Sequence, residues 1–118
     1  MQEEKTTIGN IHVSPRAIGT IAYQAVLESY GVVGMASKNV INGLAKILTK
    51  DPTKGVDVNF DGDKISIDLY IVVEYGTRIK SVARSVSNTV RYHVERSLGA
   101  PVSRIDVHVQ GLRISNID

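Results

Sequence analysis

The sequence predicts an α+β fold: a two-layer sandwich in which helices cover one face of a mainly antiparallel sheet, in the order β-α-(α)-β-β-α-β. Two observations predict it. Apolar and polar residues alternate over several short segments, as in strands buried on one face, and other segments repeat apolar residues every three or four positions, as in helices. Because a one-sided sheet needs a cover for its apolar face, we expect a split βαβ-like arrangement that leaves the other face open.

The N-terminal part of the chain predicts a strand followed by a helix. β-Branched residues and the alternation of Ile11 and Val13 predict a first strand over 6–13. Ser14-Pro15 predicts the helix start, because a Ser side chain can accept an orphan amide and Pro loses no hydrogen bond at the first helical position. The helix is expected to end near Tyr30-Gly31. Its apolar positions are Ile18, Ile21, Ala22, Ala25 and either Leu27 or Ser29.

A short apolar link, a second helix and a loop are expected next. The link at 31–35 lies between glycines, which permit backbone angles that other residues avoid, and we expect it to turn under the sheet. Apolar residues at spacings of four and three predict a short helix over 39–48. The stretch 51–55 is typical of a connecting loop.

A hairpin, a long helix and a last strand complete the order. Val56–Asp61 and Ile65–Val73 alternate, and Gly62 between them supplies the positive backbone angle that a hairpin turn needs. We expect the apolar side of both strands, and of a last strand over 102–112, to face the helices. Thr77 is expected to cap the long helix, and Gly99 to end it. The expected buried stripe of this helix is Ile79, Val82, Ala83, Val86, Val90, Val94 and Leu98.

Length and composition indicate one domain over 1–118, with about residues 1–5 flexible. The chain has 118 residues, 42% hydrophobic and 22% charged, which is ordinary for a globular domain. It contains no Cys, which excludes disulfide frameworks, cysteine zinc sites and thiol catalysis, and agrees with a reducing compartment. No apolar run approaches the roughly 18 residues of a membrane span, so we expect a cytoplasmic protein.

The net charge of +2 is too small to indicate a polyanion-binding protein, but the charges are unevenly distributed. The hairpin segment 56–74 carries five acidic residues against one Lys, and the helical segment 78–96 carries five basic residues against one Glu. Lys80, Arg84 and Arg91 recur along one face of the helix. This basic stripe is either a solvated face or a contact for an anionic partner such as nucleic acid, headgroups or an acidic protein.

The sequence offers no candidate for catalysis, a cofactor or a metal. The segment from Asp57 to Asp68 nearly matches a helix–loop–helix calcium loop, but its flanks alternate as strands, which separates successive carboxylates by about 6 to 7 Å. His12, His93 and His108 lie on three different elements without further ligands at metal-binding spacing, although His12 and His108 could approach if the end strands were neighbours.

Two outward positions on the hairpin are apolar where the pattern calls for polar residues. Tyr70 and Val72 alternate with the buried side of the strand, among Ser66, Asp68 and Glu74. They either pack beneath a neighbouring subunit or are shielded by Tyr75 and nearby side chains.

Three blocks of the chain together resemble one known family: 30–39 (YGVVGMASKN), 67–77 (IDLYIVVEYGT) and 107–112 (VHVQGL). From about Thr7 to the C-terminus the chain is similar to the alkaline-shock protein family, the Gram-positive envelope stress response proteins, and within it to the short YloU-like branch. The resemblance implies no enzymatic activity, cofactor or catalytic residues. It implies a cytoplasmic protein that reaches the inner side of the membrane only through a partner, and a link to lipid metabolism or the cell envelope.

The leading hypothesis is a non-enzymatic stress-response scaffold that acts through protein contacts, with a homo-oligomer left open. Two alternatives come from other classes: a nucleic-acid-binding module that uses the basic stripe, and an enzyme whose site forms at a subunit interface. The candidate interaction surface consists of Tyr70, Val72, Lys80, Arg84 and Arg91.

Overall fold

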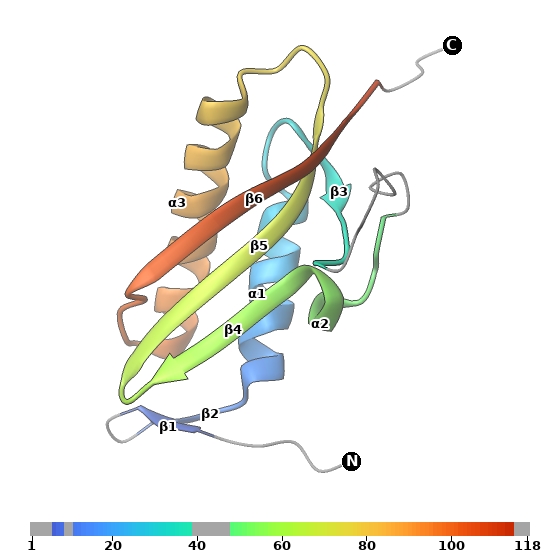
Figure 1. The fold of residues 1–118 in the computed structure, drawn as a ribbon. Helices are drawn as coiled ribbons and strands as arrows, with labels where there is room; N and C mark the ends of the chain where they lie inside the picture. The colour runs from blue at the N-terminus through green and yellow to red at the C-terminus, as the bar shows by residue number, and fades with distance from the viewer. Residues whose placement is uncertain (1–5, 9–10, 39–47, 115–118) are drawn as a thin grey trace.

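The computed structural model describes residues 6–8, 11–38 and 48–114 (Figure 1). The elements are β1 (Thr6–Ile8), β2 (Ile11–Val13), α1 (Pro15–Leu27), β3 (Val32–Met35), α2 (Pro52–Gly55), β4 (Val56–Asp61), β5 (Lys64–Glu74), α3 (Ile79–Leu98) and β6 (Arg104–Arg113). The predicted α+β class is confirmed. The helix predicted over 39–48 and the N-terminal segment 1–5 lie outside the described residues, apart from Leu48.

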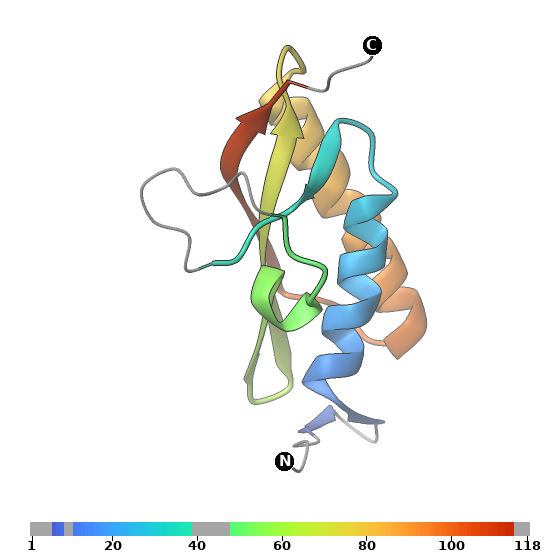
Figure 2. The ribbon, with the colours of Figure 1, turned by 90° about the vertical axis from the view of Figure 1, so that its right-hand side faces the viewer.

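The main sheet is organised around the long strand β5. β6 runs parallel to β5 along one of its edges. On the other edge, β4 pairs antiparallel with the first half of β5 and β3 pairs antiparallel with its second half. α1 and α3 lie together on one face of this sheet, and the side view shows the two layers (Figure 2). The predicted sandwich, with helices on one face, is confirmed.

The core lies between the helices and the apolar side of the sheet, in the predicted register. Ile65, Ile67, Leu69 and their alternating successors on β5 are buried, and Val107 of β6 packs against them. The α3 positions that close the core are Val82, Val86, Val90, Val94 and Leu98, whereas Ile79, predicted to belong to this stripe, is 41% exposed. A one-residue shift of register would have reversed this pattern.

The prediction of one strand over 6–13 is wrong. This segment forms a separate antiparallel pair, β1 with β2, and the predicted link at 31–35 supplies the edge strand β3 instead. Gly31 allows this turn because its φ is +85°, and a Cβ there would lie 2.6 Å from Cγ2 of Val82. A residue without a side chain is therefore required where the chain leaves α1 and enters the sheet.

The helix ends agree with the sequence in part. Ser14 caps α1 as predicted, since its Oγ accepts from the amide of Ala17 at 3.3 Å, but α1 ends at Leu27, and it is Ser29 that is buried. Thr77 is not the cap of α3: its hydroxyl donates to the carbonyl of Glu74 at 2.7 Å, and Arg78 stands at the N-cap.

The remaining expectations concern short segments and the membrane. Gly99 ends α3 with a φ of +69°, as predicted. The expected loop at 51–55 contains the single helical turn α2, started by Asp51, whose carboxylate accepts from the Thr53 amide at 3.0 Å. Neither long helix in the part of the chain described above has the length and apolar character needed to cross a bilayer.

Candidate interaction surface

Three aspartates form a row across the open face of the sheet. In the strand register Asp57 of β4 pairs with Asp68 of β5, and Asp68 pairs with Asp106 of β6. Each alternates with residues packed on the core, so all three belong to the face that the helices do not cover. Like charges on directly opposite residues of neighbouring strands repel one another, so this row needs cations nearby.

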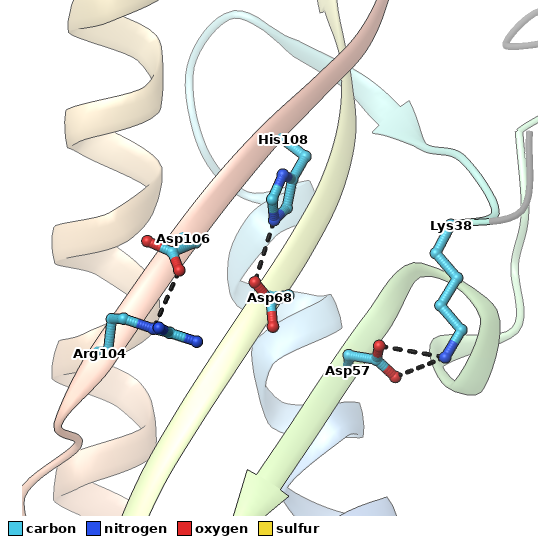
Figure 3. A network of polar contacts seen from close by, with 6 residues as sticks. All are labelled: Lys38, Asp57, Asp68, Arg104, Asp106 and His108. Atoms are coloured by element: carbon cyan, nitrogen blue, oxygen red, sulfur yellow. Dashed lines mark hydrogen bonds and ion pairs between the residues drawn. The ribbon is translucent and has the colours of Figure 1, made fainter.

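Each aspartate of the row has its own cationic or imidazole partner (Figure 3). Lys38 Nζ lies 2.9 Å from Oδ1 of Asp57, and His108 Nε2 lies 3.0 Å from Oδ1 of Asp68. Arg104 Nε lies 2.9 Å from Oδ2 of Asp106. We call these six residues the open-face network. Its side chains are partly exposed, so each pair adds little to stability, and the main effect of the network is to offset repulsion within the row.

Lys38 reaches the network from the segment that follows β3. Its backbone amide donates to the carbonyl of Lys54 at 3.0 Å, which holds this segment beside the start of β4. The hydrogen bond and attraction from Asp57 raise the pKa of Lys38 above its usual 10.5. Lys38 therefore stays charged at neutral pH while it balances one end of the row.

Tyr70 lies beside the row and stacks on His108. The two rings are 4.7 Å apart between centroids, with 13° between their planes. The Tyr70 side chain is partly buried, and burial together with the negative charge of Asp68 raises its pKa above the usual 10.0. Tyr70 and His108 thus form a flat aromatic pair next to the aspartate row, in agreement with the outward direction predicted for Tyr70.

Val72 points to the same face as Tyr70 but is not exposed. Only 1% of it is accessible, because Val33, Ala36 and Leu48 pack over it. Of the two sequence-based alternatives, shielding by neighbouring side chains is therefore correct. Tyr75, which was expected to contribute to this shielding, does not belong to the cluster around Val72 and is 64% exposed. The prediction that Val72 belongs to an exposed interaction surface is wrong.

The predicted basic stripe is divided between two roles. Lys80 and Arg84 are exposed on α3, whereas Nη1 of Arg91 donates to the carbonyl of Val102 and lies 3.5 Å from Oε2 of Glu95. The same Glu95 oxygen accepts from the amide of Val102 at 2.7 Å. Arg91 therefore fastens the start of the last strand to α3. Because α3 covers the opposite face of the sheet, the five predicted surface residues do not form one surface.

The rejected calcium loop is a hairpin, as predicted. Asp57 and Asp68 are paired across β4 and β5, and Gly62 in the turn has a φ of +64°. Within residues 6–8, 11–38 and 48–114, no three His, Asp or Glu side chains are placed to hold a metal ion. β2, which contains His12, pairs with β1, and β6 pairs with β5, so the end strands are not neighbours.

Comparison with known proteins identifies the family. Residues 3–114 match the model of the ASP23 family, described as having a cell envelope-related function. The chain is 43% identical to the uncharacterized protein YloU of Bacillus subtilis (strain 168) over 116 residues, which cover 97% of both chains. It is 34% identical to the uncharacterized protein Spy1614 of Streptococcus pyogenes serotype M6 over 111 residues, covering 92% of each.

Among solved structures, the zinc form of a variant MamM CTD is similar in fold. It has a TM-score of 0.51 and 14% sequence identity, and the match covers 86% of this chain and 89% of the other. At this identity the likeness concerns the fold alone. The family assignment rests on the sequence matches over nearly the whole chain, and by them the protein belongs to the ASP23 family, whose role is cell envelope-related.

Proposed function

We propose that the protein is a non-catalytic interaction module with a role in the envelope stress response, and that its open sheet face binds a second copy of the chain. The observation that carries this proposal is the open-face network. Side chains that are already ordered before contact favour binding, because ordering them on binding costs about 0.5 to 1.5 kcal/mol each. The six network residues are held in pairs, and Tyr70 is stacked on His108.

The charge arrangement favours a second copy as the partner. The aspartate row has Lys38 and His108 on one side and Arg104 on the other (Figure 3). A copy turned by 180° and set against this face can place its carboxylates opposite Lys38 and Arg104. A two-fold contact repeats every favourable pair twice, and complementary potentials set the register of such an interface.

The other sequence-based alternatives receive less support. For nucleic-acid binding, engagement of Arg91 with Val102 and Glu95 leaves two of the three predicted stripe cations, Lys80 and Arg84, for phosphate contacts. For an enzyme, the three aspartates of the row are each already engaged with Lys38, His108 or Arg104. A binding role uses these groups as they stand. The envelope role of the family, and the link to lipid metabolism that the resemblance implies, fit a module that recruits other proteins.

The test compares two substitutions of Asn by Arg. Asn59 is exposed on the open face, between Val58 and Phe60 of the core, and Asn88 is exposed on α3. We expect wild type and Asn88→Arg to form dimers in sedimentation equilibrium, and Asn59→Arg to dissociate at least tenfold more readily, with unchanged circular dichroism. A wild type that stays monomeric at millimolar concentration, or an equal effect of both substitutions, would contradict the proposal.

A further inference from the structure

Large hydrophobic residues are exposed mainly at one end of the molecule. Seven are at least 41% exposed in the part of the chain that the structure describes, and six of them belong to the ends of α1, β5 and β6 and the start of α3. We call these six the end patch: Leu27, Tyr30, Tyr75, Ile79, Leu112 and Ile114. This end is uppermost in Figure 1. Single exposed hydrophobic residues are ordinary, but a group of them indicates a contact surface.

Backbone hydrogen bonds tie the segments that carry the end patch. The amide of Glu74 donates to the carbonyl of Gly31 at 2.8 Å, and the amide of Tyr75 donates to the carbonyl of Arg113 at 2.8 Å. Tyr30 and Thr77 line a common cavity of about 470 Å³. The loops after α1 and β5 and the end of β6 therefore form one connected surface, separate from the open-face network.

The two tyrosines of the end patch stand on tight turns. Tyr30 precedes Gly31 and Tyr75 precedes Gly76, whose φ angles are +85° and +93°. They are 83% and 64% exposed, so most of each side chain lies in solvent. A tyrosine has an apolar ring and a hydroxyl that needs water or a hydrogen-bond partner, and such side chains are favoured where a hydrocarbon phase meets an aqueous one.

Cations slightly outnumber carboxylates around the end patch. Arg78, Lys80 and Arg113 are exposed there, against the exposed Glu28 and the half-buried Glu74. The hairpin turn that carries Asp61 and Asp63 lies at the opposite end of β5. These cations beside exposed tyrosines complement an extended surface that is apolar beneath a negatively charged layer.

We propose that the end patch docks directly on an anionic lipid surface, with Tyr30 and Tyr75 in the headgroup region and Arg78, Lys80 and Arg113 against lipid phosphates. Shallow insertion of apolar side chains combined with attraction of cations is how peripheral domains bind such membranes. This goes beyond the expectation that the chain reaches the membrane only through a partner. It uses a different surface from the proposed protein contact, which leaves the open face free while the protein is on the lipid.

The test is co-sedimentation of the full chain with phosphatidylcholine vesicles, with and without phosphatidylglycerol. We expect binding to the anionic vesicles and at least tenfold weaker binding to the neutral ones. The variant Tyr30→Ser/Tyr75→Ser should lower the partition coefficient about tenfold or more. Tyr92→Ser is the matched control, because Tyr92 is the seventh exposed hydrophobic residue and lies elsewhere on α3, beneath Arg96.

A second pair of variants tests the charges. Each cation near an anionic membrane surface is worth roughly fivefold in affinity, so Arg78→Gln/Lys80→Gln should weaken binding about 25-fold, whereas Arg96→Gln should leave it unchanged. Wild type that fails to bind anionic vesicles overturns the proposal, as does equal loss from Tyr92→Ser and the Tyr30/Tyr75 variant. Dimerisation abolished by Tyr30→Ser/Tyr75→Ser, without vesicle binding, would assign the patch to a second copy. Asn59→Arg should bind vesicles like wild type, which separates this test from that of the open face.

Discussion

Replacing Val72 by Ala tests whether this residue is part of a covered cluster or of an exposed face. The structure buries it completely beneath Val33, Ala36 and Leu48, and its Cα partner Gly34 allows the close approach of Leu48, since a Cβ at Gly34 would lie 2.8 Å from Leu48 Cδ1. The substitution removes two methyl groups from this cluster. At about 0.8 kcal/mol for each buried group, with up to about 1 kcal/mol for the remaining cavity, the expected loss is about 1.6 to 2.6 kcal/mol.

Urea and thermal unfolding measure this loss. An unfolding entropy of about 2.1 cal/mol/K per residue over the 118 residues gives a decrease in Tm of roughly 6 to 10 °C. Ile114→Ala, which truncates a side chain that is 77% exposed, serves as the control and should change stability by less than about 0.5 kcal/mol. A loss for Val72→Ala as small as that of the control would refute the assignment of Val72 to a buried cluster.

Three further changes test other parts of the structure. Gly31→Ala should destabilise the fold by about 2 to 4 kcal/mol in urea unfolding, because Gly31 has a φ of +85° and an added Cβ would clash with Val82. An unchanged urea midpoint would show that the chain does not make this turn at Gly31. Arg91→Ala should cost about 1 kcal/mol through its lost bond to the Val102 carbonyl, whereas Arg84→Ala should be neutral; equal effects would contradict the structural role of Arg91. The raised pKa of Tyr70 implies a contribution to stability that is complete below pH about 10 and is lost as the pH rises through the folded-state pKa. As the pH rises through 10 and above, the free energy of unfolding should fall more for wild type than for Tyr70→Phe. Equal falls for the two proteins would contradict a raised pKa of Tyr70.

Alternation predicted the strands that have one apolar side and one polar side. β4, β5 and β6 follow this rule, and their register is as expected because a shift by one residue would bury aspartates. β3 does not follow it: Val32–Met35 is apolar throughout except for Gly34, and it is a strand only because β5 is long enough to pair with it. That pairing joins segments far apart in the sequence and leaves no local pattern.

The same distinction between local and distant contacts explains the candidate surface. The hairpin turn at Gly62 determines that Asp57 faces Asp68, so this part of the aspartate row follows from counting residues back from the turn. The place of Asp106 in the row depends on the parallel register between β5 and β6, and no tight turn between these strands determines that register. Alternation predicted the side of the sheet on which Val72 lies but not the side chains that cover it, because Val33, Ala36 and Leu48 are distant from it in the sequence.

The end patch could not be recognised from the sequence for a related reason. Tyr30 and Tyr75 belong to turns, where hydrophobic periodicity carries no information, and the fold alone brings those turns to the end of β6. Each of these tyrosines precedes a glycine, Gly31 or Gly76, so the sequence indicates the two turns but not that the fold brings them together.

The most direct test of the open face as a self-association surface is a concentration series of NMR spectra that follows the ring signals of two histidines. His108 stacks on Tyr70 in the open face, whereas His93 contacts Tyr92 on α3. If the open face binds a second copy, the His108 ring signals shift with concentration while those of His93 stay unchanged, and Asn59→Arg abolishes the His108 shifts. Signals of both rings that do not change up to millimolar concentration, or shifts confined to His93, would contradict self-association through the open sheet face.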